Sequence, residues 1–320
     1  MCTAIHYGNF FGRNLDLDIS YGEQVIVSPR NFCFSFRKTS SFYSHYAIIG
    51  IGTVANGYPL YYDGVNEKGL AMAGLNFPDN AHYFPETQEK QNISPFELIP
   101  YILGKCASVS EAKQMFKEIN LANIHFSKEL PLSPLHWMIS DKDSSIVVEP
   151  LKSGIMTYDN PIGVLTNNPT FDYHLINLSN YMNVTPKEPK NRFSDKINIS
   201  PYSRGMGGIG IPGDLSSASR FVKAAFTLLN SPGFCDKHES LSQFFHILTS
   251  VKQQKGCVHI NDKYEFTIYS SCCDLETATY YYTTYKNPAI SAVYLSHENI
   301  DGDNIITYPL SDNILINNIN

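Results

Sequence analysis

The residue most able to carry chemistry is Cys2, in the opening stretch MCTAIHYGNFFGRNLDLD. If Met1 is removed, a thiol and a free α-amino group belong to one residue. The thiolate form of cysteine is the nucleophile. An α-amino group, with an ordinary pKa of about 7.7–8.0, is partly neutral near pH 7 and can accept the thiol proton. Cys2 would then supply a nucleophile and a general base together.

The segment that follows Cys2 predicts a β-hairpin. Gly8-Asn9 lies between two strand-like runs, and glycine at the first central position suits a two-residue type II′ turn. This turn places Cys2 opposite Leu15, with Arg13 as the diagonal neighbour of the thiol on the same face. A permanent cation at that position favours the thiolate over the thiol.

Asp16 lies just beyond the paired stretch and could hold the amine of Cys2 by a hydrogen bond. The alternative interpretation is an ordinary surface ion pair between Arg13 and Asp16. Cys2 would then be a small apolar residue packed inward at the start of a strand. The hairpin alone does not decide between these two interpretations.

The elements that must position these residues are strand-like runs in consecutive blocks, with helical patterns segregated between them. This order is typical of antiparallel sheets covered by helices rather than of alternating βαβ units. No linker or repeat divides the chain, so we expect one α+β domain over residues 1–320. The predicted helices cover residues 94–106, 108–120, 217–230 and 241–251. The predicted strands are Cys2–Tyr7, Phe10–Asn14, Gln24–Pro29, Phe32–Phe36, Tyr46–Val54, Leu70–Leu75, Leu135–Ser140, Ser145–Glu149, Ile155–Tyr158, Val164–Thr166, Tyr264–Ser271, Ala278–Thr284 and Ala289–Leu295.

The overall composition argues against several classes of partner. The formal net charge is -6 and the basic residues are scattered, which disfavours binding to nucleic acid or to an anionic membrane surface. No apolar run is long enough to span a bilayer, and the amino terminus lacks the pattern of a secretory signal. The seven cysteines have no CxxC spacing and fit reduced thiols. We therefore expect a cytoplasmic protein.

Other segments match the sequence pattern of cofactor or metal sites but lack the structural context that such sites need. GIGIPG at 208–213 fits a dinucleotide-binding pattern, but it follows a loop and not a strand. Cys272 and Cys273 are adjacent on a strand, so their side chains point to opposite faces and are interpreted as core thiols. His136 and His246 lie in apolar contexts and are interpreted as core histidines. We predict no metal and no cofactor.

Several longer motifs together resemble the choloylglycine hydrolase family of N-terminal-nucleophile hydrolases, which contains bile salt hydrolases and penicillin V acylases. These motifs are MCTAI, FGRNLDLD, YPLYYDGVNEKGLAMAGLNFP, LPLSPLHWMISD, GVLTNNPTFDY, GGIGIPGDLSSASRF and FTIYSSCCD. They run along the whole chain and are more specific together than any short motif. The resemblance implies an αββα sandwich, two stacked antiparallel sheets with helices outside, and a mature chain that starts at Cys2.

The resemblance also implies a set of site residues for the hydrolysis of an amide. Thiolate attack places negative charge on the carbonyl oxygen, and amide donors fixed beforehand stabilise that charge. The matching residues are Cys2 for the nucleophile, Arg13 and Asp16 for the arginine and aspartate beside it, Asn76 and Asn167 for the oxyanion-stabilising positions, and Arg220 for the second arginine, which could orient Asp16 or Asn167.

The residue at position 76 favours one branch of the family. The penicillin acylase branch tends to carry tyrosine where this chain has Asn76, so the resemblance implies conjugated bile salts as substrates. Members of the family are commonly homotetramers, so the resemblance also implies a homotetramer. A steroid needs an apolar wall beside the nucleophile, and Leu15, Phe126 and Leu130 are candidates, with core packing as their alternative. The rival functions are a penicillin V acylase, an N-acyl homoserine lactone acylase, and a non-catalytic binding protein of the same fold.

Overall fold

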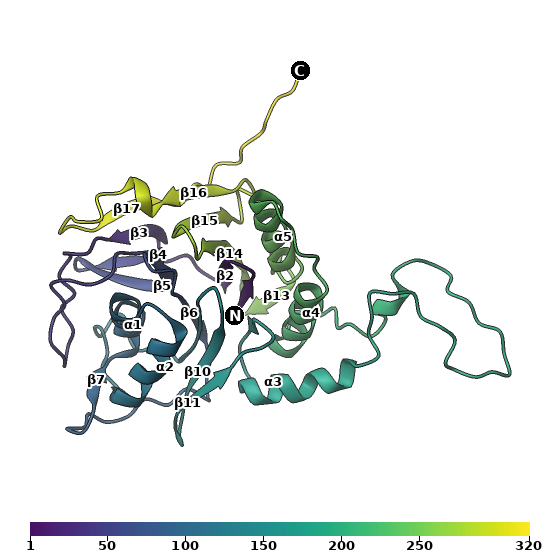
Figure 1. The fold of residues 1–320 in the computed structure, drawn as a ribbon, viewed down its shortest axis with the longest axis horizontal. Coiled ribbons are helices and arrows are strands. Elements are labelled where there is room, and N and C mark those ends of the chain that lie inside the picture. The colour runs from purple at the N-terminus through teal and green to yellow at the C-terminus, as the bar shows by residue number, and fades with distance from the viewer.

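Two large antiparallel β-sheets lie face to face in the computed structural model, which describes residues 1–320 (Figure 1). Helices cover the two outer faces, so the chain forms four layers in the order helix, sheet, sheet, helix. This is the αββα sandwich of the α+β class that the sequence predicts. No helix has the length and apolar character needed to cross a membrane.

The seven-stranded sheet contains the amino-terminal strand in an internal position. Its strands lie in the order β12 (Val164–Leu165), β1 (Cys2–Tyr7), β2 (Phe10–Leu17), β14 (Lys263–Asp274), β15 (Thr279–Thr284) and β16 (Ser291–Tyr294), with β13 (Val258–Ile260) paired to β14. The strand β1 pairs with β12 at Ala4 and Ile5 and with β2 along its whole length, so the pairing with β2 extends to Cys2.

The eight-stranded sheet faces the first and is entirely antiparallel. Its order is β11 (Gly154–Asp159), β10 (Ser145–Leu151), β9 (Leu135–Ser140), β6 (Ala71–Asn76), β5 (Tyr58–Asn66), β4 (Ile48–Ala55), β3 (Gln24–Ser28) and β17 (Ile306–Pro309). A separate parallel pair consists of β7 (Gln91–Ile93) and β8 (Ile119–Leu121).

Two pairs of helices close the outer faces. The helices α1 (Leu98–Lys105) and α2 (Val109–Glu118) pack on the eight-stranded sheet, and α4 (Ser217–Leu229) and α5 (Lys237–Thr249) pack on the seven-stranded sheet, with α3 (Phe171–Asn177) beside α4. Short 3₁₀ turns lie at Pro95–Glu97, Leu178–Tyr181, Met206–Gly208 and Leu295–His297. Alternation along a strand divides the apolar residues between two cores: in β4, Ile49 faces the other sheet and Ile48 faces α1.

The structure differs from the sequence-based expectation in several elements. The short strands β7, β8, β13 and β17 are not among the predicted strands, and three further differences follow. The segment Phe32–Phe36 forms only an isolated bridge, between Phe34 and Phe42. Its aromatic rings pack on one another and on Phe42, so Phe34 and Phe36 are buried without a strand ladder. The strand β5 was not predicted, because its sequence contains proline, glycine and aspartate, which are depleted in strands. The helix α3 is short and was also not predicted.

The interpretation of His246 as a core histidine is wrong. His246 lies on α5 and is exposed, whereas Phe245 and Ile247 on either side of it are buried. An apolar neighbourhood in sequence does not fix the face of a helix, because adjacent residues are rotated by about 100°. His136, in β9, is fully buried as predicted.

The helices α3 and α4 meet through two stacked rings. The imidazole of His174 lies on the ring of Phe221, with 4.7 Å between the centroids and 15° between the planes. Its Nε2 donates to the main-chain oxygen of Asn167 at 2.9 Å. Burial lowers the pKa of His174 to about 4; the bond to Asn167 opposes this, and His136 and Arg220 add to it.

This pKa predicts a loss of stability in acid. In the unfolded chain the histidine is protonated below its ordinary pKa of about 6.5, whereas in the folded protein it stays neutral down to about 4. The free energy of unfolding should therefore fall as the pH drops from about 6.5 to 4, by up to about 3 kcal/mol from this residue. We expect urea unfolding at several pH values to show a shallower acid dependence in His174→Gln. An identical slope in both proteins would contradict the assignment.

Candidate active site

The amino-terminal hairpin has the predicted register. Gly8 adopts a positive φ of 58° at the turn, as the first central position of a type II′ turn requires. In the ladder Cys2 lies opposite Leu15, and Ala4 lies opposite Arg13. Cys2, Arg13 and Leu15 therefore share the face that points toward the second sheet.

The thiol of Cys2 is in direct contact with a buried cation. Arg13 is 1% exposed, and its Nη2 donates to Cys2 Sγ. Its Nη1 donates to the main-chain oxygen of Gly74 in β6 at 2.5 Å, which ties the cation to the facing sheet. Burial alone would lower the pKa of Arg13, but Cys2, Tyr269 and Asp63 raise it above its ordinary value. The guanidinium therefore stays charged beside the sulfur, in agreement with the predicted diagonal contact.

A buried carboxylate balances this cation and was not found from the sequence. Asp63, in β5, is fully buried, and its carboxylate accepts hydrogen bonds from Tyr269 at 2.6 Å and from Tyr280. Burial raises the pKa of Asp63, and Arg13 and the two hydroxyl donors oppose that rise. A charged residue inside a buried strand was the available signal, because such residues are rarely buried unless paired.

Removing the charge of Asp63 should be strongly destabilising. Asp63→Asn removes the buried carboxylate whose charge acts on the guanidinium of Arg13, and leaving a buried charge uncompensated typically costs about 3–5 kcal/mol. The urea midpoint should fall accordingly. The control is Asp159→Asn, which removes an exposed ion pair with Lys113 and should cost no more than about 1 kcal/mol. Equal losses in the two variants would show that Asp63 does not balance Arg13.

A single side-chain amide joins three of the predicted site residues. Asn167 follows β12, and its Oδ1 accepts from the main-chain nitrogen of Cys2 at 2.8 Å and from Arg220 Nη2 at 2.7 Å. Its Nδ2 donates to the main-chain oxygen of Asn76 at 2.6 Å. The structure thus brings the end of β6, the start of β1 and the start of α4 together around one amide.

Arg220 holds the amino-terminal strand from the helix side. Its Nη1 donates to the main-chain oxygen of Cys2 at 2.5 Å and to Thr3 Oγ1 at 2.6 Å. It is 1% exposed, and burial lowers its pKa while Asp16 and Cys2 oppose the change. Of the two residues that Arg220 was expected to orient, Asp16 or Asn167, Asn167 accepts a hydrogen bond from it, and the orienting role stays a prediction.

Asp16 contacts the amino terminus of the chain, and one oxygen of its carboxylate has no hydrogen-bond partner. Its Oδ1 accepts from Thr267 Oγ1 at 2.6 Å, and its buried Oδ2 has no hydrogen-bond partner in the chain. The amino group of Met1 donates to the main-chain oxygen of Asp16 at 2.6 Å and lies 2.9 Å from Glu265 Oε1. Burial raises the pKa of Asp16, and Arg220 and the amino terminus oppose the rise. Thr3 and Asp16 lie on the face of the sheet opposite to the thiol.

The three candidate pocket residues are not equally close to Cys2. Leu15 is its cross-strand partner and is buried in the core between the sheets. Phe126 packs on Tyr58 and Phe96, beside the core under α1. Leu130 is 37% exposed. Only Leu15 is in contact with the strand of Cys2, and pocket roles for the other two stay predictions.

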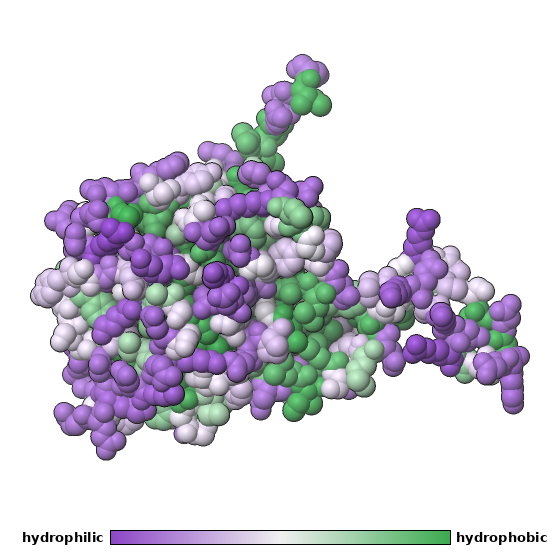
Figure 2. Space-filling view, viewed as in Figure 1, coloured by the Kyte–Doolittle hydropathy of each residue, from purple (hydrophilic) through white to green (hydrophobic).

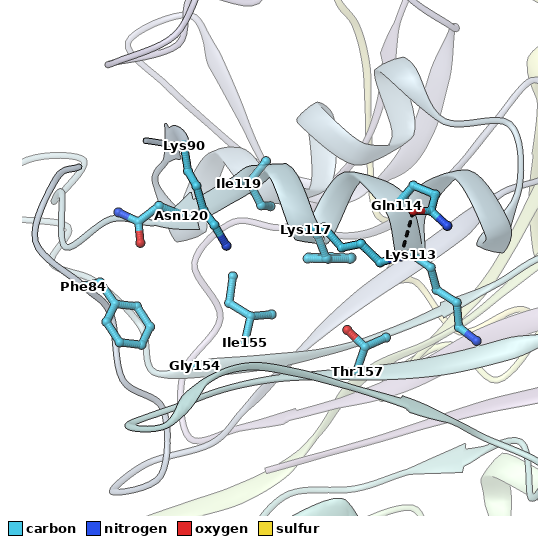
Figure 3. A pocket seen from close by; sticks show the side chains of 11 residues that line it. Phe84, Lys90, Lys113, Gln114, Lys117, Ile119, Asn120, Gly154, Ile155 and Thr157 are labelled. Carbon is cyan, nitrogen blue, oxygen red and sulfur yellow. Dashed lines mark hydrogen bonds between the residues drawn. The ribbon is translucent and has the colours of Figure 1, made fainter. Parts of the chain in front are cut away.

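The remaining features lie apart from this cluster. Cys272 and Cys273 are fully buried, as predicted, and burial raises the pKa of both thiols well above the ordinary value. A cavity of about 680 Å³ lies between α2 and β11 (Figure 3), and none of the six predicted catalytic residues lines it. Its walls carry Lys90, Lys113 and Lys117.

Comparisons with known proteins show the family and the fold of this chain. Residues 2–308 match the model of a family described as linear amide C–N hydrolases, choloylglycine hydrolase family. A bile salt hydrolase/transferase from Lactiplantibacillus plantarum is 56% identical over 314 residues, 97% of each chain. A solved mutant of the conjugated bile acid hydrolase from Clostridium perfringens has a TM-score of 0.92 at 38% identity and covers 100% of both chains. The penicillin V acylase from Agrobacterium tumefaciens shares the fold, with a TM-score of 0.76 at 19% identity, over 97% of this chain and 92% of its own.

Proposed function

The chain belongs to the choloylglycine hydrolase family of linear amide C–N hydrolases, and from this membership we propose that it is a bile salt hydrolase. The reaction is cleavage of the amide bond that joins a bile acid to glycine or taurine. The observation that carries the proposal is the contact of the Cys2 thiol with the buried guanidinium of Arg13. Beside that contact, the amide of Asn167 binds both Cys2 and Arg220.

The proposed reaction starts when loss of Met1 frees the amino group of Cys2. This amine takes the thiol proton, and the thiolate held by Arg13 attacks the amide carbon of the substrate. The side chain of Asn76 makes no hydrogen bond within the chain, and one hydrogen of Asn167 Nδ2 is unused. These two amides would donate to the oxyanion, and each donor of this kind is typically worth about 10²–10³ in rate.

Collapse of the oxyanion breaks the C–N bond. The amine returns its proton to the leaving nitrogen, which departs as glycine or taurine, and the acyl group stays on Cys2 as a thioester. Water then attacks the thioester, with the same amine taking its proton and returning it to the sulfur. The free Oδ2 of Asp16 would hold the ammonium form of the amine between these steps.

The test of the substrate is the release of amine from three compounds. We expect purified protein, with its amino terminus checked by intact mass, to release glycine from glycocholate and taurine from taurocholate faster than it cleaves the side-chain amide of penicillin V. Much faster turnover of penicillin V would favour the acylase rival of the same family. Binding of bile salts with no release from any compound would favour a non-catalytic protein.

We also propose a homotetramer. Residues 182–212 form an arm that projects from the body, and Figure 2 shows a group of hydrophobic residues on the body beside it. The exposed apolar side chains of the arm and of the adjacent helices include Met182 (82%), Phe193 (83%), Tyr202 (84%), Ile176 (72%) and Leu229 (56%). Exposed apolar groups of this kind commonly mark contacts between chains. Light scattering should give a mass near four times 36.0 kDa, and the mass of a single chain would contradict the proposal.

A cytoplasmic location completes the proposal. The seven cysteines are all unpaired, and Cys33, Cys235 and Cys257 are exposed. Exposed thiols persist in a reducing compartment, whereas oxidising compartments favour disulfides. Cell fractionation should find the activity with cytoplasmic markers, and activity mainly in the medium or the envelope would contradict this location.

A further inference from the structure

Two buried histidines bind the segment that carries Asn167. His136 Nε2 lies 2.9 Å from the main-chain oxygen of Thr166, and His174 Nε2 lies 2.9 Å from the main-chain oxygen of Asn167. Both imidazoles are fully buried. Two consecutive carbonyl groups, directly after the two-residue strand β12, are therefore each bound by a ring N–H. This fixes a segment that has few ladder hydrogen bonds of its own.

The same two rings stack on residues next to other parts of the site. The ring of His136 lies on Phe77, with 4.1 Å between centroids and 6° between planes, and Phe77 directly follows Asn76. His174 stacks in the same way on Phe221, which directly follows Arg220. Each imidazole thus joins the Asn167 segment to a second segment that contacts it.

The groups around each imidazole also determine how the ring is oriented. His136 Nδ1 lies 3.2 Å from Glu149 Oε1, and the same oxygen accepts from the main-chain nitrogen of Phe171 at 2.9 Å. Both nitrogens of His136 therefore face acceptors, Nδ1 the carboxylate of Glu149 and Nε2 the carbonyl of Thr166. His174 Nδ1 has no partner, so its single proton lies on Nε2. Glu149 thus orients the first ring and binds the first residue of the helix that carries the second.

We propose that His136 and His174 are positioning residues for the hydrolysis, which hold Asn167, Asn76 and Arg220 in their arrangement around Cys2. Neither imidazole contacts the sulfur or the reacting carbonyl in this role. They act by setting where the amide of Asn167 lies relative to the nitrogen of Cys2 and the oxygen of Asn76. The inference rests on the proposed hydrolase function, because positioning is defined by its effect on that reaction.

The test compares variants that separate the ring from the donor. His136→Phe and His174→Phe keep a stacked ring and remove the N–H donor, whereas His136→Gln and His174→Gln keep an N–H near the place of Nε2. For each protein, with Met1 removal checked by mass, kcat and KM for glycocholate and the rate of Cys2 alkylation by iodoacetamide are measured. We expect the phenylalanine variants to lose about 10–100-fold in kcat, since small misplacements of catalytic groups have effects of this size. KM and the alkylation rate should change less than about threefold, because Arg13 is untouched, and the glutamine variants should recover most of kcat.

A third buried histidine provides the matched control. His45 also lies against a phenylalanine ring, Phe34, at 4.7 Å, and its nitrogens face the main-chain oxygens of Phe32 and Tyr46. It belongs to the region of the core under α1, away from Cys2. His45→Phe should lower Tm as the other phenylalanine variants do, but leave kcat unchanged.

Three outcomes would overturn the inference. The first is phenylalanine variants that keep kcat within twofold of the unmodified protein, and the second is a loss of kcat no greater than in His45→Phe at equal Tm. If a phenylalanine variant does not fold, His174→Gln is compared with His174→Asn, whose shorter side chain cannot bring an N–H to the oxygen of Asn167. The third outcome that would overturn the inference is an equal kcat in these two variants. Absence of hydrolysis in the unmodified protein would instead reject the proposed function.

Discussion

Replacing Cys2 with serine is expected to lower kcat/KM for glycocholate by a factor of about 10⁴ or more, while the protein remains folded. In the proposed reaction the nucleophile is a thiolate beside Arg13, and a serine hydroxyl, with its much higher ordinary pKa, cannot ionise to a useful extent there. Loss of the nucleophile in other hydrolases has effects of this size or larger. The measurement is amine release at substrate concentrations well below KM, with Tm as the test of folding.

Cys33→Ser is the control for this substitution. Cys33 is exposed and lies outside the cluster around Cys2, so its replacement should leave turnover unchanged. If Cys2→Ser retained turnover within tenfold of the unmodified protein, the sulfur would not be the nucleophile and the mechanism would have to be abandoned.

A chain that retains Met1 should be almost inactive, although it has every side chain of the site. With Met1 present, the nitrogen of Cys2 is a peptide nitrogen that donates to Asn167 Oδ1 and has no lone pair to accept a proton. The amino group of Met1 lies instead between the carbonyl of Asp16 and Glu265. General bases of this kind contribute about 10²–10⁴ to the rate, so we expect kcat to fall by about 10³.

Such protein can be made in cells whose methionine aminopeptidase is inhibited, and intact mass shows the fraction that keeps the residue. Unfolding, treatment with methionine aminopeptidase and refolding should restore turnover in proportion to the methionine removed. A sample carried through the same cycle without the enzyme controls for refolding. Full activity in the methionine-containing chain would exclude the amine of Cys2 as the base.

The part of the site that was derived from residues alone is the part built by local structure. A two-residue turn at Gly8-Asn9 sets the register of its hairpin, so the contact of Arg13 with Cys2 could be predicted over eleven residues of sequence. Asn167 and Arg220 are brought to Cys2 by the sheet order and by α4, over 165 and 218 residues. Only the resemblance to a family supplied those two.

The features that the sequence did not predict also depend on contacts between distant segments or on ambiguous local patterns. The charge of Asp63 acts on Arg13 from the opposite sheet, and no periodicity in the sequence relates the two strands. His136 was expected to be a core residue, and it is one, but its hydrogen bond to Thr166 follows from the packing of β9 near β12 and could not be inferred from its own strand. The segment Phe32–Phe36 was expected to be a strand because a run of aromatic residues satisfies strand preferences as well as those of an aromatic cluster.

The placement of Thr3 and Asp16 behind the strand whose front carries the sulfur has a practical consequence for engineering. Asp16 and Thr3 face the layer of α4 and α5, whereas the sulfur and Arg13 face the second sheet. Substitutions between the sheets should therefore alter the surroundings of the sulfur, and substitutions beneath α4 and α5 should alter those of Asp16, so that the two sides of one strand can be varied separately.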